Sequence, residues 1–177
     1  MRLSQRHPGR PRLVVLHTKG SHYLYTARYP RAFATFGPEC PGTDSLCSAE
    51  QLIASYDNSI VFTDHVLHEL ATRLKDRPVL MVYTSDHGES IGENLHFHAT
   101  PRKIAPPEQR RVPLLLWASP AFLKDPVRRA GFERAQARAA TAKDGDVGHG
   151  HLFATLLGCA GVASPDGGIT AAHDLCH

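Results

Sequence analysis

The sequence contains no apolar run long enough to cross a membrane, which needs roughly 18 consecutive apolar residues. The apolar stretch behind the basic N-terminus, LVVLH, is also too short to be the core of a signal peptide. We therefore see no export signal in this sequence. The 177 residues, 42% of them hydrophobic, match one globular domain that can bury its own core.

The sequence also lacks a strong charge bias and a series of aromatic residues among its basic groups. The net charge is +3, and the Lys and Arg residues form small groups, including the lead-in at residues 1–12. Single-stranded nucleic acid is bound by basic grooves lined with stacking aromatic side chains. No nucleic-acid partner is expected.

No CxxC motif occurs among the four cysteines, which argues against a zinc ribbon and against a thioredoxin-like redox site. Cys40 and Cys47 lie in a loop-like segment rich in Pro, Gly, Asp and Ser. They can close a small disulfide ring in an oxidising compartment, or remain two reduced thiols in the cytosol. Whether Cys159 and Cys176 form a bond is left open.

Alternating apolar runs and helical patterns predict an α/β domain with a mostly parallel sheet flanked by helices. Short buried strands are predicted at 12–17, 78–85 and 111–119. A helix is predicted from Ser48 to about residue 75, because Ser48 and Gln51 form a capping-box pattern.

The C-terminal part of the sequence gives two weaker patterns. The segment 126–143, rich in Ala and Arg, is either an exposed helix or a mobile loop. The sequence GHGHLFATLLGCAGV predicts a helix of about ten residues that is closed by glycine.

The chemistry of the chain is concentrated in the segment VYTSDHGESIGENLHFHATP, which follows the predicted strand 78–85. In α/β sheets, ligands bind beyond the carboxyl ends of the strands, where Asp86 and His87 fall. Both residue types are zinc ligands, and Gly88 permits the turn that lets them face one ion. The triplet alone is equally compatible with an ordinary buried turn.

Other side chains of this segment have less defined roles. His96 and His98 share a face if the chain is extended, although such a pair is also common in exposed loops. Glu89 and Glu93 are expected to cap the backbone or to orient a ligand histidine rather than to take part in catalysis.

The segment TSDHGESIGENLHFHATPRKIAPPEQRRVPLLLWAS resembles the zinc-binding segment of lipid A phosphoethanolamine transferases, which belong to the alkaline phosphatase and sulfatase superfamily. Further stretches resemble the same family in the same order: LVVLHTKGSHYLYTARYP, the segment from FGPEC to the YDNS helix, and the closing helix HGHLFATLLGCAGV. The resemblance covers nearly the whole sequence from residue 13 onward, so residues 13–177 look like the C-terminal part of such a catalytic domain.

The resemblance implies a zinc enzyme that moves phosphoethanolamine from phosphatidylethanolamine to lipid A or core lipopolysaccharide through a phospho-threonine. It implies that Asp86 and His87 bind Zn²⁺ and that the catalytic residues His22 and His98 lie beside the phosphoryl group. It also implies a location at the periplasmic face of the bacterial inner membrane, where Cys40 and Cys47 could pair.

The sequence departs from the family in several places. The spacing before His98 is shorter by about one residue, so either His98 keeps the family role, which we favour, or His96 takes it. His149 stands in place of a family histidine, but its neighbours differ and its role is open. Relatives also carry membrane helices, a zinc-binding glutamate and the nucleophilic threonine upstream.

Because those upstream parts have no match here, we expect this chain on its own to bind zinc weakly and to be inactive. Alternative readings are a sulfatase or another phosphotransferase of the superfamily, or a non-catalytic metal-binding remnant.

Overall fold

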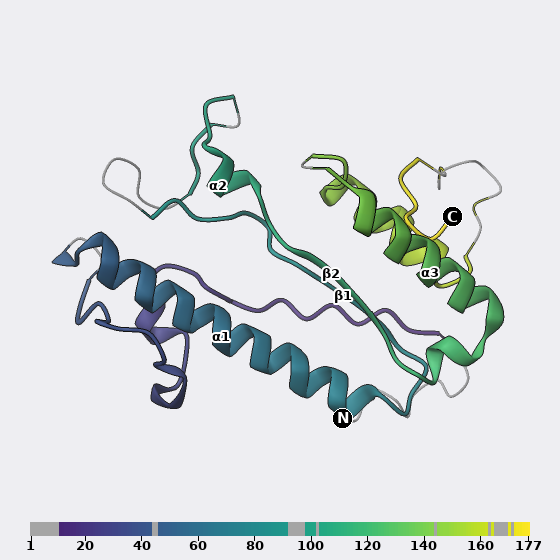
Figure 1. Ribbon diagram of the computed structural model, residues 1–177, viewed down its shortest axis with the longest axis horizontal. Helices are drawn as coiled ribbons and strands as arrows, with labels where there is room; N and C mark the ends of the chain where they lie inside the picture. Colours follow the sequence, from purple (N-terminus) through teal and green to yellow (C-terminus); the bar gives the residue numbers. More distant parts are fainter. Residues whose placement is uncertain are drawn as a thin grey trace.

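The structure is a computed structural model and describes residues 11–43, 46–91, 98–101, 103–143, 145–162, 164, 170 and 172–177. The longer elements, in chain order, are α1 (Ala49–Leu74), β1 (Leu80–Thr84), α2 (Pro107–Arg110), β2 (Leu114–Ala118), α3 (Pro126–Thr141) and α4 (Leu152–Cys159). Short 3₁₀ helices, labelled η, lie at Tyr25–Ala27 (η2), Arg31–Phe33 (η3), Phe122–Lys124 (η5) and His149–His151 (η6). In the view of Figure 1, β1 and β2 run between α1 and α3, and α2 lies beyond one end of the strands.

Helix α1 begins where its sequence predicts. The Ser48 hydroxyl accepts from the backbone N–H of Gln51 at 3.2 Å, and the Gln51 side chain accepts from the backbone N–H of Ser48 at 2.9 Å. This reciprocal capping box satisfies two N–H groups that the first turn leaves without helical partners. The helix then buries Leu52 against Tyr25 of η2, so α1 holds the segment that contains His22.

The two strands pair antiparallel, with Leu80 opposite Ala118 and Thr84 opposite Leu114. Both strands were predicted correctly, but the parallel arrangement is wrong for this pair. A parallel pair needs a crossover of a dozen or more residues, usually a helix that packs on the sheet. The only helix among the described residues between β1 and β2 is the four-residue α2. Without a longer crossover helix, the chain reverses direction after β1 and β2 pairs antiparallel with it.

One face of the strand pair forms the core of the C-terminal half. Leu80 and Leu116 pack against two buried clusters, one that contains Phe122 and Phe132 and one that contains Cys159. Successive side chains of a strand point to opposite faces, and on the other face Leu115 is 42% exposed. The face towards α3 and α4 therefore carries the core of this half, while the opposite face leaves Leu115 exposed.

The segment 12–17 is not a strand, in contrast to the prediction. It belongs to no sheet of the described residues, and its apolar side chains lie at the surface, with Leu13 74% and Val15 78% exposed. β-propensity reflects packing against neighbouring strands and burial more than an intrinsic backbone preference. A short apolar segment therefore forms a strand only where a neighbouring strand is available to pair with it.

The C-terminal segments resolve the remaining alternatives. Residues 126–141 form the helix α3, capped by the Asp125 carboxylate, which accepts from the N–H groups of Val127 and Arg128. α4 ends as predicted at a glycine. Gly161 has φ +78°, and the N–H of Val162 bonds to the carbonyl of Leu157, the pattern of a Schellman motif.

Two disulfides join the four cysteines, Cys40 to Cys47 and Cys159 to Cys176. Cys40 is buried beside Tyr25 and Leu52, and its N–H donates to the Ser55 hydroxyl of α1 at 2.9 Å. The first disulfide thus fastens the loop before α1 to the helix. The second fastens the C-terminal segment to the end of α4.

Removing either disulfide is expected to destabilise the chain, because each limits the freedom of the unfolded state. The bonded residues are 7 and 17 positions apart, for which loop-closure entropy predicts about 2.5 and 3 kcal/mol. Urea unfolding of the Cys40→Ser/Cys47→Ser and Cys159→Ser/Cys176→Ser double variants measures both contributions. A reductant should have no effect on a variant that lacks all four cysteines, and unchanged stability of both double variants would contradict the prediction.

Candidate active site

A tight turn at the end of β1 presents Asp86 and His87. The Ser85 hydroxyl donates to the carbonyl oxygen of His87 at 2.7 Å, and the N–H of His87 donates to Asp86 Oδ1 at 3.1 Å. His87 Nδ1 lies 2.9 Å from the carbonyl oxygen of Gly88 and therefore carries the proton, which leaves the lone pair on Nε2. That nitrogen is 3.8 Å from Asp86 Oδ2.

This separation suits two ligands of one zinc ion, since ligands at about 2.0–2.2 Å from a tetrahedral zinc lie roughly 3.4 Å apart. The Asp86 carboxyl is also ionised, as a ligand must be. Without a metal, burial raises the pKa of this carboxyl, but the interaction with a protonated His87 and hydrogen bonds from the backbone and from Ser85 outweigh burial, so the pKa is lowered overall. The donors therefore fit zinc.

Close packing against α2 fixes the position of the turn. Gly88 is buried, and its N–H donates to the carbonyl of Gln109 at 3.0 Å. A Cβ at this position would overlap the backbone carbonyl of Glu108 and come within 3.0 Å of the carbonyl oxygen of Arg111. Only glycine allows the turn to approach the α2 backbone this closely.

His98 is oriented by Glu89. Its Nδ1 lies 2.8 Å from Glu89 Oε1, and the Glu89 side chain is only 5% exposed. The other carboxylate oxygen accepts from the hydroxyl of Tyr25 at 3.2 Å. Since a carboxylate accepts, Nδ1 of His98 donates, and Nε2 is free to bind a ligand or exchange a proton. Glu89 thus has the orienting role that the sequence suggested.

Three imidazoles lie in a row at this site. The rings of His87 and His98 stack with centroids 4.1 Å apart, and His22 lies 6.0 Å from His98. Arg28 donates to the backbone carbonyls of His22 and Tyr23, which holds the exposed His22 loop in place. Asp86, His87, His22 and His98 therefore come together from segments more than sixty residues apart in sequence.

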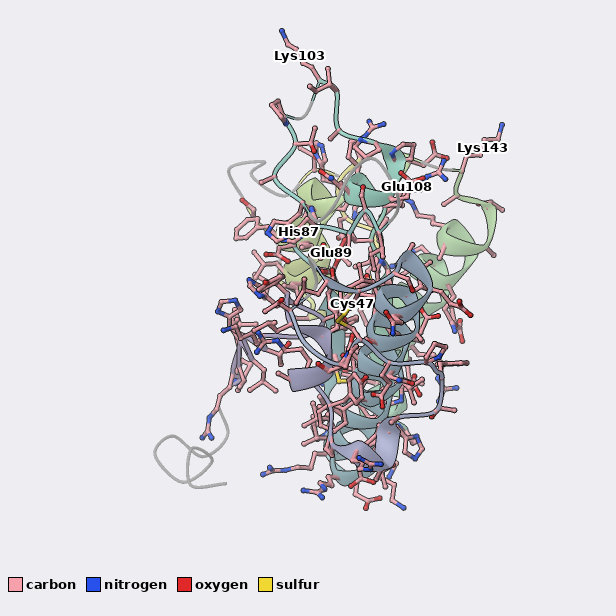
Figure 2. The ribbon with its side chains drawn as sticks, turned by 90° about the vertical axis from the view of Figure 1, so that its left-hand side faces the viewer. Cys47, His87, Glu89, Lys103, Glu108 and Lys143 are labelled. Carbon is pink, nitrogen blue, oxygen red and sulfur yellow. A yellow bond between two sulfur atoms is a disulfide. The ribbon has the colours of Figure 1, made fainter. Side chains whose placement is uncertain are left out.

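The donors around His87 form a group that could hold a metal ion. One ligand atom from each of His87, Glu89 and His98 lies within 4.8 Å of the others, and Figure 2 shows His87 and Glu89 next to each other. A second group, Cys159, Asp174 and Cys176, also meets this distance criterion. Its sulfur atoms are joined in the disulfide, so it offers no thiolate to a metal.

Two residues of the site had no sequence signal. Tyr25 supports Glu89 from a position 64 residues earlier. Gln109 is buried, and its side chain donates to the Ser90 hydroxyl and accepts from the N–H of Thr100, which ties both ends of the site loop to α2. Glu93 and His96 lie outside the described residues, so the alternative to His98 is not resolved.

Comparisons with known proteins show the family of this chain. The sulfatase family profile matches residues 2–162. The chain is 46% identical over 176 residues to the Kdo(2)-lipid A phosphoethanolamine 7''-transferase of Escherichia coli (strain K12), covering 97% of this chain and 30% of that protein. It is 41% identical over 159 residues to the phosphoethanolamine transferase EptA of Salmonella typhimurium, covering 85% and 28%. The chain thus spans about a third or less of the length of these relatives.

A solved structure gives the same result. The soluble domain of lipooligosaccharide phosphoethanolamine transferase A from Neisseria meningitidis superposes with a TM-score of 0.74 at 35% identity, covering 81% of this chain and 43% of that one. None of the helices in the described part of the chain combines the length and apolar character that spanning a bilayer requires. The predicted α/β fold of sulfatase type and the resemblance to phosphoethanolamine transferases are both confirmed. The chain belongs to the sulfatase family.

Proposed function

We propose that this chain is part of the catalytic domain of a zinc-dependent phosphoethanolamine transferase of the bacterial inner membrane, facing the periplasm. The donor is phosphatidylethanolamine, and the acceptor is lipid A or core lipopolysaccharide. The proposal rests on the proximity of the Asp86–His87 turn to His98 and His22. Asp86 Oδ2 lies 3.8 Å from His87 Nε2, and the ring centroids are 4.1 Å apart for His87 and His98 and 6.0 Å apart for His98 and His22. The relatives named above supply the substrate class.

Each side chain has a chemical task in this proposal. Asp86 Oδ2 and His87 Nε2 would hold zinc, which when bound would polarise phosphoryl oxygens and stabilise the negative charge of an attacking oxygen. The Nδ1 of His98 donates to the Glu89 carboxylate at 2.8 Å, which orients the ring so that Nε2 can hand over a proton. The exposed His22, 6.0 Å from His98, accepts a proton.

The transfer then proceeds in two steps. In the first, a threonine oxygen loses its proton to His22 and bonds to phosphorus, while the bond to the diacylglycerol oxygen breaks and that oxygen takes a proton from His98. In the second, the acceptor oxygen gives its proton to His98 and displaces threonine, which recovers its proton from His22. We propose that this threonine lies outside residues 1–177, because no threonine of the chain stands in a stretch that resembles the nucleophile segment of the family.

Zinc binding tests the metal site directly. We expect Asp86→Ala and His87→Ala each to weaken zinc binding at least about tenfold, because each removes one ligand. Competition against a chromophoric chelator measures the affinity, and His68→Ala, an exposed histidine of α1, is the matched control. Equal affinity in all variants would show that zinc binds elsewhere.

Activity tests the reaction. The purified 177-residue chain should not transfer phosphoethanolamine from a labelled phosphatidylethanolamine to lipid A, since the nucleophile is proposed to lie outside it. The same assay on a polypeptide extended by the coding sequence upstream of Met1, if that sequence supplies a threonine nucleophile, should show transfer that His98→Ala abolishes. Robust transfer by the short chain, or full activity of the extended His98→Ala variant, would overturn the proposal.

A further inference from the structure

His149 lies on a different element from the other site residues, yet its ring reaches the turn at the end of β1. It is the first residue of η6, which precedes α4. Its Nε2 lies 2.7 Å from the backbone carbonyl oxygen of Ser85. Since a carbonyl only accepts, Nε2 carries the proton and donates. The bond joins segments 64 residues apart.

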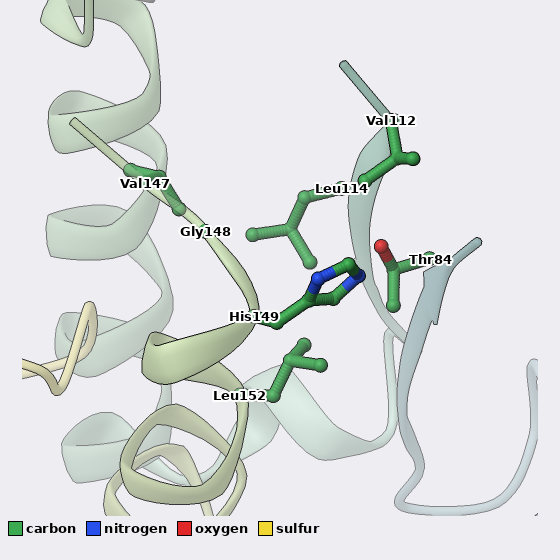
Figure 3. A pocket seen from close by; sticks show the side chains of 7 residues that line it. All are labelled: Thr84, Val112, Leu114, Val147, Gly148, His149 and Leu152. Carbon is green, nitrogen blue, oxygen red and sulfur yellow. The ribbon is translucent and has the colours of Figure 1, made fainter. Parts of the chain in front are cut away.

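The His149 ring is exposed, but it points towards β1 (Figure 3). Figure 3 shows it directed from η6 towards Thr84 of β1. It lies in a small pocket whose other lining residues are mostly apolar: Thr84, Val112, Leu114, Val147, Gly148 and Leu152. The apolar side chains of this lining pack around the ring on the side that faces β1, where the Ser85 carbonyl accepts its hydrogen bond.

This bond closes one side of the turn that presents Asp86 and His87. The Ser85 carbonyl belongs to the peptide group that joins Ser85 to Asp86, and it also accepts from the Thr84 hydroxyl at 3.2 Å. Both lone pairs of the oxygen are then used. The orientation of this peptide plane sets the direction in which Asp86 leaves the chain.

The other side of the turn is closed independently. The peptide group that joins His87 to Gly88 accepts at its carbonyl from the Ser85 hydroxyl at 2.7 Å and donates through its N–H to the Gln109 carbonyl at 3.0 Å. The peptide planes before Asp86 and after His87 are thus both held. Among the described residues that hold the first plane, Thr84 is adjacent in sequence and His149 comes from a distant part of the chain.

We infer that His149 is a positioning residue that fixes the peptide plane before Asp86 and so aligns the Asp86–His87 ligand pair. It touches neither substrate nor metal. The inference rests on the proposed zinc site. It assigns to α4 and its preceding turn a task at the site: docking of this C-terminal segment on β1 completes the metal-binding geometry.

The test compares a variant that removes the donor with one that retains it. His149→Leu should weaken zinc binding about tenfold, the lower end of the effect of removing groups that orient metal ligands. It should also change the visible spectrum of the chain loaded with Co²⁺, which reports ligand geometry. His149→Gln keeps an N–H donor and should restore most of the affinity. His68→Leu, at an exposed histidine of α1, should leave both readouts unchanged.

A loss of packing is separated from a loss of the hydrogen bond by Leu152→Ala. This variant removes apolar contact in the same pocket but keeps the imidazole, so it should lower the melting temperature without changing zinc affinity. Equal loss of zinc affinity in Leu152→Ala, or no rescue by His149→Gln, would overturn the inference.

The metal-free chain provides a readout that does not depend on the proposed function. The amide N–H of Asp86 belongs to the peptide group that His149 polarises, so its NMR chemical shift should move in His149→Leu and return in His149→Gln. If the wild-type chain binds no Co²⁺, the proposed zinc site is wrong. The NMR shift of the Asp86 amide in the metal-free variants then still shows whether His149 fixes this peptide plane. An unchanged Asp86 amide in His149→Leu would sink it.

Discussion

Replacing Gly88 with alanine is expected to weaken zinc binding by about 100-fold, the upper end of the range for groups that orient metal ligands. The free energy of unfolding should fall by about 3 kcal/mol, as for other overpacked interior sites. The added Cβ would overlap the carbonyl of Glu108 and approach that of Arg111 within 3.0 Å. Both are backbone atoms, so neither can rotate away, and the turn that carries Asp86 and His87 must move instead.

The matched control is Gly42→Ala. Gly42 has no heavy atom within 4 Å of a built Cβ and does not adopt a positive φ, so alanine should be tolerated there with unchanged zinc affinity. Chelator competition and urea unfolding of the two variants give both quantities. Wild-type zinc affinity in Gly88→Ala would mean that the contact between the turn and α2 is not needed for the site.

Local interactions explain which parts of the fold could be predicted from the sequence. The capping box of Ser48 and Gln51 and the glycine at position 161 act within a few residues of themselves, so the pattern contains the whole interaction. The strands β1 and β2 could be predicted because each is a short apolar run that is recognisable from its own residues. The direction of their pairing depends on the path between them, which residue spacing does not encode.

The segment 12–17 shows the limit of such patterns. Its apolar side chains predict burial, but burial requires a surface that comes from elsewhere, and Leu13 and Val15 remain exposed among the described residues. The apolar pattern of 12–17 does not indicate which other segment would cover it. The disulfides show the same limit, because four cysteines allow three pairings and spacing alone does not choose between them.

The candidate site divides in a similar way. Asp86 and His87 are adjacent, so a strand followed by glycine predicts that they share a turn. The contacts that orient the site join distant segments: Tyr25 to Glu89, and His149 to Ser85, each across 64 residues. A single sequence gives no distance between such residues. The resemblance to a family placed His22 and His98 together, whereas composition and spacing alone did not.

The YDNS stretch of α1 illustrates how a motif can be recognised before its physical role is known. Asn58 is fully buried, and its Oδ1 accepts from the backbone N–H groups of Thr35 and Phe36, both at 2.8 Å. Its Nδ2 donates to the Phe36 carbonyl at 3.0 Å and to the Tyr29 hydroxyl at 3.3 Å. One amide therefore fastens the loop that follows η3 to the middle of α1.

Asn58→Leu is expected to reduce the free energy of unfolding by about 4 kcal/mol. Leucine has a similar size but removes the fully buried amide that holds two backbone N–H groups and a carbonyl in part-buried hydrogen bonds, and each such loss costs about 1–3 kcal/mol. Urea unfolding followed by circular dichroism at the helix band measures the change.

Ser59→Ala is the control, since Ser59 is equally buried and its hydroxyl donates only to the Tyr56 carbonyl one turn earlier in α1. Its loss should cost less than about 1 kcal/mol, because such bonds within a helix add little to stability. If Asn58→Leu costs no more than Ser59→Ala, the loop is held by the packing of Phe33 against Phe62 rather than by the amide. The order of the two variants therefore decides which interaction fixes the N-terminal segment on α1.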